Sequence, residues 1–472
     1  MSAWEAIDFR GLLLVLIIVI LLLVMALVIR WSNSGSNSEL FNFKRDVERS
    51  GKKNLKQEKK EKEEEKTFLG ISNSRQDIYV SNNAKHIFVC GTTGSGKTVA
   101  LSNFIKSGIE NDYPMLIIDG KGDIGENSLL DIVGKLSTEK ADKKVYVVNL
   151  VNPETSDKYN PFKNTGPDIV KDMIINMTTW SEEHYKYNAE RYIQRLINLL
   201  VLSEIPISLD SITEYISVDA FTKLSKDLEG KSKKITKQEH KANVELTKTS
   251  GGIATDAAAR FAVIKESGLG QIFDEAGIDI YTALKENAII LFILNPLDYP
   301  EMSPLIGRLL IIDSKKAISL FYRERKKRIF YLLDEINVYA TDNMFDLINK
   351  SRSANITCIL ATQSLSDLEK ASGEAFRKQI IENCNNYILL RQNESSNAEN
   401  WASILGTRHT MNATYQIKGS NGNFDSTELG SLRRTREFIY HPDDIKRLRT
   451  GQAIYLSRDE DFHTKIKINK PF

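Results

Sequence analysis

The residues best suited to carry out chemistry form a glycine-rich run that ends in a lysine and a threonine. In order, they are Gly91, Thr92, Thr93, Gly94, Ser95, Gly96, Lys97 and Thr98. This run fits the phosphate-binding pattern G-x-x-x-x-G-K-S/T, in which glycines let backbone N–H groups approach phosphate oxygens. Lys97 is expected to reach the β- and γ-phosphates of ATP, and the Thr98 hydroxyl is expected to bind Mg²⁺. The sequence therefore predicts a site for ATP and Mg²⁺.

The residues around this run favour the same interpretation. An apolar run at residues 87–90 precedes it and is expected to form a buried strand, and apolar residues at helical spacing follow it at residues 99–105. The motif requires this order of strand, loop and helix, because the positive N-terminus of the helix then faces the same anion. The alternative is a glycine-rich turn that matches the pattern by accident.

Two later apolar runs also end in polar residues. Residues 329–333 lead into Asp334 and Glu335, and residues 356–362 lead into Gln363. Asp334 is expected to hold Mg²⁺ through water, and Glu335 is expected to act as the general base for the attacking water. Gln363 is expected beside the γ-phosphate as a sensor of hydrolysis, as in RecA-like motors. The alternatives are a turn that happens to carry two acids and, for Gln363, a helix cap.

The order of apolar and helical segments predicts an α/β fold. Alternating strands and helices are typical of a RecA-like, doubly wound and mostly parallel sheet, whose carboxyl strand ends face the ligand crevice. Asp119 and Lys121 follow one of these strands and are expected near the nucleotide, or in a turn that closes on itself. The expected strands lie at residues 78–80, 87–90, 115–118, 145–148, 288–293, 329–335, 356–363, 386–390, 415–418, 438–440 and 453–456.

One long stretch carries helical patterns and lacks any strand pattern. Apolar residues between positions 192 and 200 recur on one helical face. We therefore predict an all-helical inserted domain at residues 167–249, within a nucleotide-binding domain formed by residues 76–166 and 250–472. The basic stretch at residues 231–241 is either a DNA contact or a solvated helix face.

The N-terminal region predicts a membrane anchor. Residues 12–29 are all apolar and would span about 27 Å as a helix, close to one hydrocarbon core. Basic residues follow this run, so the positive-inside rule places the N-terminus outside and the ATPase domain in the cytoplasm. We expect a single-pass inner-membrane segment at residues 1–31 and a charged flexible linker at residues 32–75. A cleavable signal peptide is the alternative.

Composition places few limits on function. The chain has 472 residues, a formal net charge of +2 and enough apolar residues, 41%, to build a globular core. Because the net charge is small, any affinity for nucleic acid must come from local basic patches. Cys90, Cys358 and Cys384 are predicted to be buried thiols in a reducing compartment, and no pattern typical of zinc ligands occurs.

The order of these motifs resembles the type IV coupling proteins of conjugative transfer, the TraG/TraD group. The resemblance covers about residues 76–456 and includes the anchor and the helical insertion, although that group more usually has two membrane spans. Its motifs are the phosphate-binding run, residues 119–123 (DGKGD), 159–162 (YNPF), 332–335 (LLDE), 361–364 (ATQS) and 390–393 (LRQN).

This resemblance implies a membrane-bound ATPase that assembles as a homo-hexameric ring. It would bring relaxase-bound DNA to a type IV secretion channel and pump the single strand, with little sequence preference. The resemblance also implies that an arginine from the neighbouring subunit completes each ATP site, and Arg352 matches an arginine often found there. Arg260, Arg308 and a plain surface role for Arg352 are the alternatives.

Two other classes of motor share the same core motifs. One is a chromosome-segregation DNA translocase of the FtsK type. The other is a secretion-channel ATPase that moves only protein. Relaxase or secretion-channel genes beside this one would favour the coupling protein, whereas cell-division genes would favour the segregation motor.

Overall fold

The structure describes the chain from residue 65 onward, together with Met25. The predicted membrane helix at residues 12–29 lies outside the described residues except for Met25, as does the predicted linker up to residue 64. Residues 65–472 form one compact unit, and none of the helices in the described part of the chain is long and apolar enough to cross a bilayer. The computed structural model describes residues 25, 65–83, 85–138, 140, 142–176, 183–230, 233–322, 324, 327–420 and 423–471.

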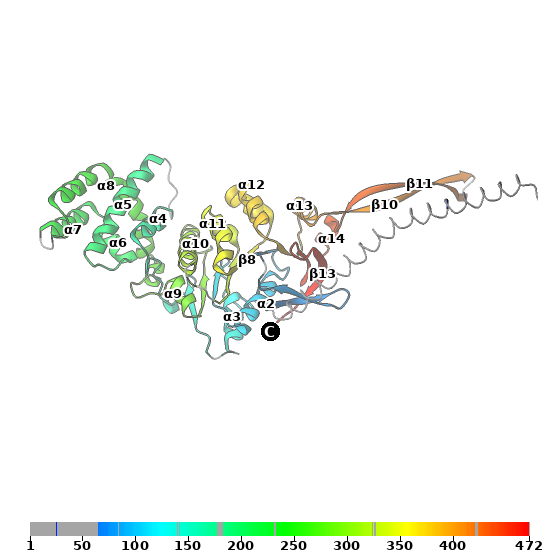
Figure 1. The fold of residues 1–472 in the computed structure, drawn as a ribbon, viewed down its shortest axis with the longest axis horizontal. Coiled ribbons are helices and arrows are strands. Elements are labelled where there is room, and N and C mark those ends of the chain that lie inside the picture. The colour runs from blue at the N-terminus through cyan, green and yellow to red at the C-terminus, as the bar shows by residue number, and fades with distance from the viewer. Residues whose placement is uncertain are drawn as a thin grey trace, which may run out of the picture. The chain divides into compact units, whose positions relative to one another are not determined.

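Among the described residues, eleven strands form one sheet (Figure 1). The strand order is β2-β1-β13-β12-β9-β3-β8-β7-β4-β6-β5. Strands β9 to β5 in this order are parallel, whereas β12, β13, β1 and β2 pair antiparallel. The predicted α/β fold with a mostly parallel sheet is therefore confirmed. The strands are β1 Lys66–Ser72, β2 Asp77–Ser81, β3 Ile87–Cys90, β4 Met115–Asp119, β5 Val145–Asn149, β6 Ile289–Ile293, β7 Ile329–Asp334, β8 Ile356–Thr362, β9 Asn386–Leu389, β12 Gln452–Ser457 and β13 Phe462–Ile468.

Strand β1 corrects the end of the predicted linker. The sequence places residues 66–72 in a charged linker that ends at residue 75, but they form an edge-region strand between β2 and β13. Buried and exposed side chains partly alternate along this strand, and Leu69, which is 1% exposed, packs into the core. The Lys/Glu run that precedes the strand makes this short pattern hard to recognise in the sequence. The sheet therefore begins next to the charged run.

Helices cover both faces of the parallel strands. Side chains alternate between the faces of a strand, so Phe88 and Cys90 enter one core while Ile87 and Val89 enter the other. The first core lies under α9 Ile280–Lys285, α10 Met302–Phe321, α11 Asn343–Ser351, α12 Leu365–Asn383, α13 Ser395–Leu405 and α14 Pro442–Lys446, and the second lies under α2 Lys97–Glu110 and α3 Leu129–Thr138.

The three cysteines are buried free thiols, as predicted. Burial raises the pKa of the Cys90 and Cys358 thiols to about 12. They are therefore protonated at neutral pH and pack as small apolar side chains.

The described elements between β5 and β6 are helical and include a separate bundle (Figure 1). Tyr192 and Phe221 stack at its centre, with ring centroids 4.7 Å apart. Leu309 and Ile312 of α10 join this third core, which ties the bundle to the sheet. The bundle consists of α4 Pro167–Asn176, α5 Glu183–Leu202, α6 Leu209–Tyr215, α7 Val218–Gly230 and α8 Lys237–Glu266.

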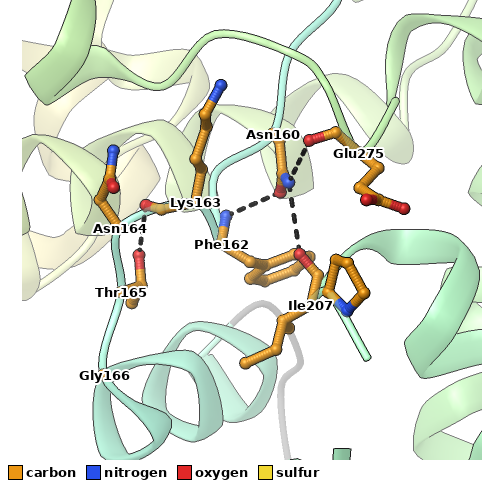
Figure 2. A pocket seen from close by; sticks show the side chains of 9 residues that line it. Asn160, Phe162, Lys163, Asn164, Thr165, Gly166, Ile207 and Glu275 are labelled. Atoms are coloured by element: carbon orange, nitrogen blue, oxygen red, sulfur yellow. Dashed lines mark hydrogen bonds between the residues drawn. The ribbon is translucent and has the colours of Figure 1, made fainter. Parts of the chain in front are cut away.

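Asn160 joins the start, the middle and the end of this helical insertion. Figure 2 shows its amide between the carbonyl oxygens of Ile207, at 3.3 Å, and Glu275, at 3.2 Å. Its side-chain oxygen accepts a bond from the Phe162 N–H at 3.1 Å. A hollow of about 500 Å³ lies beside these contacts. Because the polar groups of Asn160 hold separate chain segments together, the 159–162 motif has a structural role here.

Lys316 also holds the segment that contains residues 159–162. Its Nζ, in a side chain that is 2% exposed, lies 2.6 Å from Asp313 Oδ1 and 3.1 Å from Asp279 Oδ2. It also donates to the carbonyl oxygen of Pro161. A buried cation with two carboxylates and a backbone acceptor holds the base of the insertion in one arrangement.

A long hairpin follows α13. Its strands are β10 Thr407–Ser420 and β11 Asn423–Phe438, and among the described strands each pairs with the other alone. The sequence predicts only short strands at 415–418 and 438–440. The two long strands contain many polar and charged residues, so most of their length lacks the apolar residues by which a buried strand is recognised. The hairpin leaves the sheet near β12 and β13.

Candidate functional site

The predicted chemical residues lie at the carboxyl ends of adjacent parallel strands. The glycine-rich run follows β3, Gln363 follows β8, Asp334 ends β7 and Asp119 ends β4. These four strands are neighbours in the order β3-β8-β7-β4. The fold thus brings together residues that are separated by more than 240 positions in the sequence.

The glycine-rich run forms a compact loop that opens helix α2. Gly94 and Gly96 have φ values of 72° and 108°, a region that favours glycine. The Ser95 hydroxyl donates to the carbonyl oxygen of Thr92 at 2.6 Å and closes the loop. A side chain on Gly91 would meet Leu390 Cβ at 2.6 Å. Helix α2 begins at Lys97, so its unpaired first-turn N–H groups border the loop.

A chain of hydrogen bonds links the loop to the Asp-Glu turn. Lys97 Nζ lies 2.6 Å from Glu335 Oε1 and 3.8 Å from Asp334 Oδ1. Gln363 donates to the same Glu335 oxygen at 2.9 Å, and Thr93 donates to Gln363 Oε1 at 3.3 Å. The structure therefore brings Lys97, Asp334, Glu335 and Gln363 into one cluster.

Glu335 has a strained backbone and a free acceptor. Its φ of 48° and ψ of 51° are left-handed, an unfavourable region for a side chain larger than glycine. Its second carboxylate oxygen, Oε2, is buried and has no hydrogen-bond partner among the described residues. A buried carboxylate oxygen of this kind is a suitable acceptor for a proton of an attacking water.

The carboxyl groups of Asp119 and Asp334 lie side by side in the site. Asp119 and Asp334 are directly paired across β4 and β7. Burial, with the nearby Asp334 charge second, raises the pKa of Asp119 to about 7, although the backbone N–H groups of Lys121 and Gly122 donate to it. Burial also raises the pKa of Asp334, while Lys97 opposes that shift. A cation at this position would stabilise both carboxylates.

The raised pKa of Asp119 predicts a pH-dependent stability. Between about pH 4 and pH 7 the folded chain holds a proton that the unfolded chain has lost, so the free energy of unfolding should fall as pH rises. Asp119→Asn should flatten this dependence and stabilise the protein by on the order of 2 kcal/mol at pH 8. Urea unfolding at several pH values measures both effects.

Asp123 provides the matched control for this prediction. It lies in the same turn, but its pKa is lowered, first by a hydrogen bond from Lys121. Asp123→Asn should therefore leave the stability change between pH 5 and pH 8 as it is. An unchanged slope in Asp119→Asn would contradict the assignment.

Arg352 lies away from this cluster. It begins the short helix η4 Arg352–Ala354 before β8, whereas Gln363 lies beyond the other end of β8. A seven-residue strand spans about 20 Å, so Arg352 cannot reach the nucleotide site of its own chain. It is exposed, and His86 holds the preceding turn through Ile348 and Ser351.

Arg308 and Arg260 are the two alternatives to Arg352 as the arginine that completes a neighbouring site. Arg308 lies on α10, and its Nε is buried without a partner among the described residues. The side chain of Arg260 lies outside the part of the chain whose side chains are described. Of the two arginines whose side chains the structure describes, Arg352 is the exposed one.

A loop near the C-terminus also contacts the glycine-rich run, and the sequence analysis misses it. The Gly451 N–H donates to the Ser95 carbonyl oxygen at 2.9 Å, and the Thr450 hydroxyl donates to the Gly94 carbonyl oxygen at 3.2 Å. Gly451 has a φ of 77°. Its Thr-Gly pair before a strand signals a turn, but no local pattern reveals what that turn contacts.

The arrangement fits a nucleoside triphosphate with Mg²⁺. The glycine loop offers backbone N–H groups to an anion, and Lys97 adds a positive charge at the same place. Thr98 and Asp334 are the residues that would hold the magnesium ion. The described residues contain no group of three or more His, Cys, Asp or Glu side chains placed to hold a metal ion.

The chain matches two family models over separate segments. Residues 328–450 match the model described as the TraM recognition site of TraD and TraG, and residues 52–184 match the FtsK/SpoIIIE family. An uncharacterized protein of Mycoplasma pneumoniae is 27% identical over 101 residues, which cover 21% of this chain and 67% of that protein. A second is 28% identical over 95 residues, which cover 17% and 78%.

Three solved structures share the fold. The bacterial conjugative coupling protein TrwBdeltaN70 has a TM-score of 0.59 at 16% identity, covering 86% of this chain and 89% of that one. TrwB in complex with ADP and Mg²⁺ has a TM-score of 0.57 at 14% identity, covering 85% and 90%. VirB4 of Thermoanaerobacter pseudethanolicus has a TM-score of 0.53 at 12% identity, covering 85% and 96%. With the two matched segments, this shared fold confirms the predicted resemblance to type IV coupling proteins.

Proposed function

We propose that this chain, a coupling-protein-like P-loop NTPase of the FtsK/SpoIIIE class, is a membrane-anchored ATPase that pumps DNA. It assembles as a homo-hexamer, receives a relaxase-bound single strand and delivers it to a type IV secretion channel. The observation that carries the proposal is the cluster of Lys97, Asp334, Glu335 and Gln363 at the glycine-rich loop. The family models matched at both ends of the motor core support the DNA-transfer class.

Lys97 and Glu335 form an ion pair beside the phosphate-binding loop. When ATP is bound, the Lys97 ammonium contacts its phosphates. Glu335 Oε2, which has no hydrogen-bond partner among the described residues, orients and deprotonates the attacking water. Gln363 keeps Glu335 in place through its own hydrogen bond. Mg²⁺, when bound, neutralises charge on the β- and γ-phosphate oxygens.

The proposal places the ATPase unit in the cytoplasm at the inner membrane. Residues 12–29 form the single membrane span, with the N-terminus outside, and the charged linker carries the folded unit. DNA binds through basic side chains that contact phosphates, so affinity falls as salt rises and sequence matters little. Accessory and relaxase proteins are the expected partners because residues 328–450 match a TraM recognition model.

The FtsK/SpoIIIE match also favours a second candidate, a chromosome-segregation translocase. Both motors would hydrolyse ATP at the same site and move DNA. DNA transfer between cells distinguishes the two candidates. If the chain is a coupling protein, its loss should abolish conjugation and leave chromosome segregation intact. A segregation defect without a transfer defect would favour the second candidate.

Arg352 should act across the subunit boundary. Because it lies at the opposite end of β8 from its own site, Arg352→Ala should lower ATP turnover at least about 100-fold by removing charge from the neighbouring site. Mixing Arg352→Ala with Lys97→Ala subunits should restore measurable turnover, since some interfaces then pair an intact loop with an intact arginine. The absence of recovery at every mixing ratio would remove Arg352 from this role.

A further inference from the structure

The hairpin formed by β10 and β11 makes few contacts with the rest of the described chain. Apart from the pairing between its strands, its main contact among the described elements is with α13. A two-stranded ribbon without a packed face is only marginally stable in water. A ribbon of this length is therefore expected to gain a partner on one of its faces.

The two faces of the hairpin base differ in chemistry. Pairing places His409 opposite Arg436 and Met411 opposite Arg434 on one face, which we call the arginine–methionine face. Met411 is 69% exposed, and both arginines are exposed. The structure shows no hydrogen bond or ion pair for these four side chains within the described residues. This face therefore combines positive charge with exposed apolar surface.

The opposite face carries a carboxylate as well as two arginines. Asn412 donates to Glu437 at 3.4 Å, and the hydroxyls of Thr410 and Thr435 are 3.3 Å apart. Arg408 lies directly across from Glu437, and Arg433 lies directly across from Asn412. Because Glu437 offsets part of this positive charge and none of these residues is a large apolar one, this face is less attractive to an anionic lipid surface than the arginine–methionine face.

The hairpin base lies beside the strand where the linker enters. The Tyr440 hydroxyl lies 3.1 Å from His463 Nδ1, and Lys465 Nζ lies 3.2 Å from Asp444 Oδ1, so the chain after β11 packs on β13. Strand β13 pairs with β1, which follows the charged linker. The helical insertion instead leaves the sheet after β5, at the far end of the strand order.

We propose that the arginine–methionine face docks on an anionic phospholipid surface. The proposal rests on the proposed function for the membrane anchor, which would hold this end of the sheet near a bilayer. Arginines attract lipid phosphates, and an apolar side chain such as Met411 can enter the boundary between headgroups and acyl chains. Nucleic acid also presents phosphates to Arg434 and Arg436, and the experiment below distinguishes it from lipid.

A matched pair of labels on adjacent residues tests this proposal. Full-length protein carrying Met411→Cys or Asn412→Cys is labelled with an environment-sensitive fluorophore and placed in nanodiscs. The native cysteines are buried, so they do not compete for the label. The label at 411 should shift to the blue in discs containing phosphatidylglycerol and stay water-like in phosphatidylcholine discs. The label at 412, on the other face, should remain water-like in both.

Arg434→Gln with Arg436→Gln should abolish the shift at 411. A shift in both lipids would instead indicate a second copy of the chain, and a shift that needs added single-stranded DNA would indicate nucleic acid. Either result, or equal emission from 411 and 412, would overturn lipid docking. ATP turnover is measured in the same samples. A lipid-dependent shift without turnover would uphold docking and count against the proposed ATPase.

Discussion

Replacing Lys97 by alanine is expected to reduce ATP turnover at least about 100-fold, because one preorganised charge at the phosphates is lost. Lys97 is 9% exposed and starts helix α2, where its ammonium lies 2.6 Å from Glu335. Its removal takes away both the attraction for the γ-phosphate and the ion-pair partner of Glu335. ATP affinity should fall together with turnover, and a steady-state assay with a nucleotide-binding titration measures both.

Lys106→Ala is the matched control on the same helix. Lys106 lies on the surface and pairs weakly with Glu110 at 3.9 Å. Its loss should leave turnover within about twofold, since exposed ion pairs of this kind contribute little. DNA transfer at the normal frequency in Lys97→Ala cells would be inconsistent with a motor driven by this site.

Glu335→Gln is expected to separate binding from hydrolysis. Hydrolysis should fall by roughly 100- to 10,000-fold because the amide cannot take a proton from water. ATP should bind as tightly as in the wild type or more tightly, because Lys97 no longer has to leave a carboxylate to reach the phosphates. Rapid-quench hydrolysis and equilibrium ATP binding on the same preparation measure the two effects.

Glu335→Asp distinguishes the charge from its position. The aspartate keeps the negative charge for Lys97 but withdraws it by one methylene, about 1.5 Å. Hydrolysis should therefore fall while ATP affinity stays near the wild-type value. Turnover in Glu335→Gln equal to that of the wild type would remove Glu335 from its role as general base.

The sequence predicts the parallel strands and the residues at their ends because those features are local. Strands β7 and β8 are buried on both faces, so their sequences are mostly apolar up to Asp334 and Gln363. The glycine spacing at residues 91–96 reflects backbone angles that the loop itself requires. Such signals need no knowledge of the rest of the chain.

Features that depend on distant contacts are not predictable from sequence. Strand β1 lies between β2 and β13, and β13 comes nearly 400 residues later in the sequence. The contact of Gly451 with Ser95 depends on the same closure of the C-terminal strands onto the sheet. The position of Arg352 at the amino end of β8 can be predicted, but the site that we propose it completes lies on another copy of the chain.

The central claim is that this site hydrolyses ATP to move DNA. Its most direct test is ATP turnover by the purified full-length protein with Mg²⁺, with and without single-stranded DNA, beside Lys97→Ala. We predict turnover that DNA of any sequence stimulates, that rising salt weakens, and that the variant lacks. No turnover by the wild type under either condition, or equal turnover by the variant, would contradict the claim.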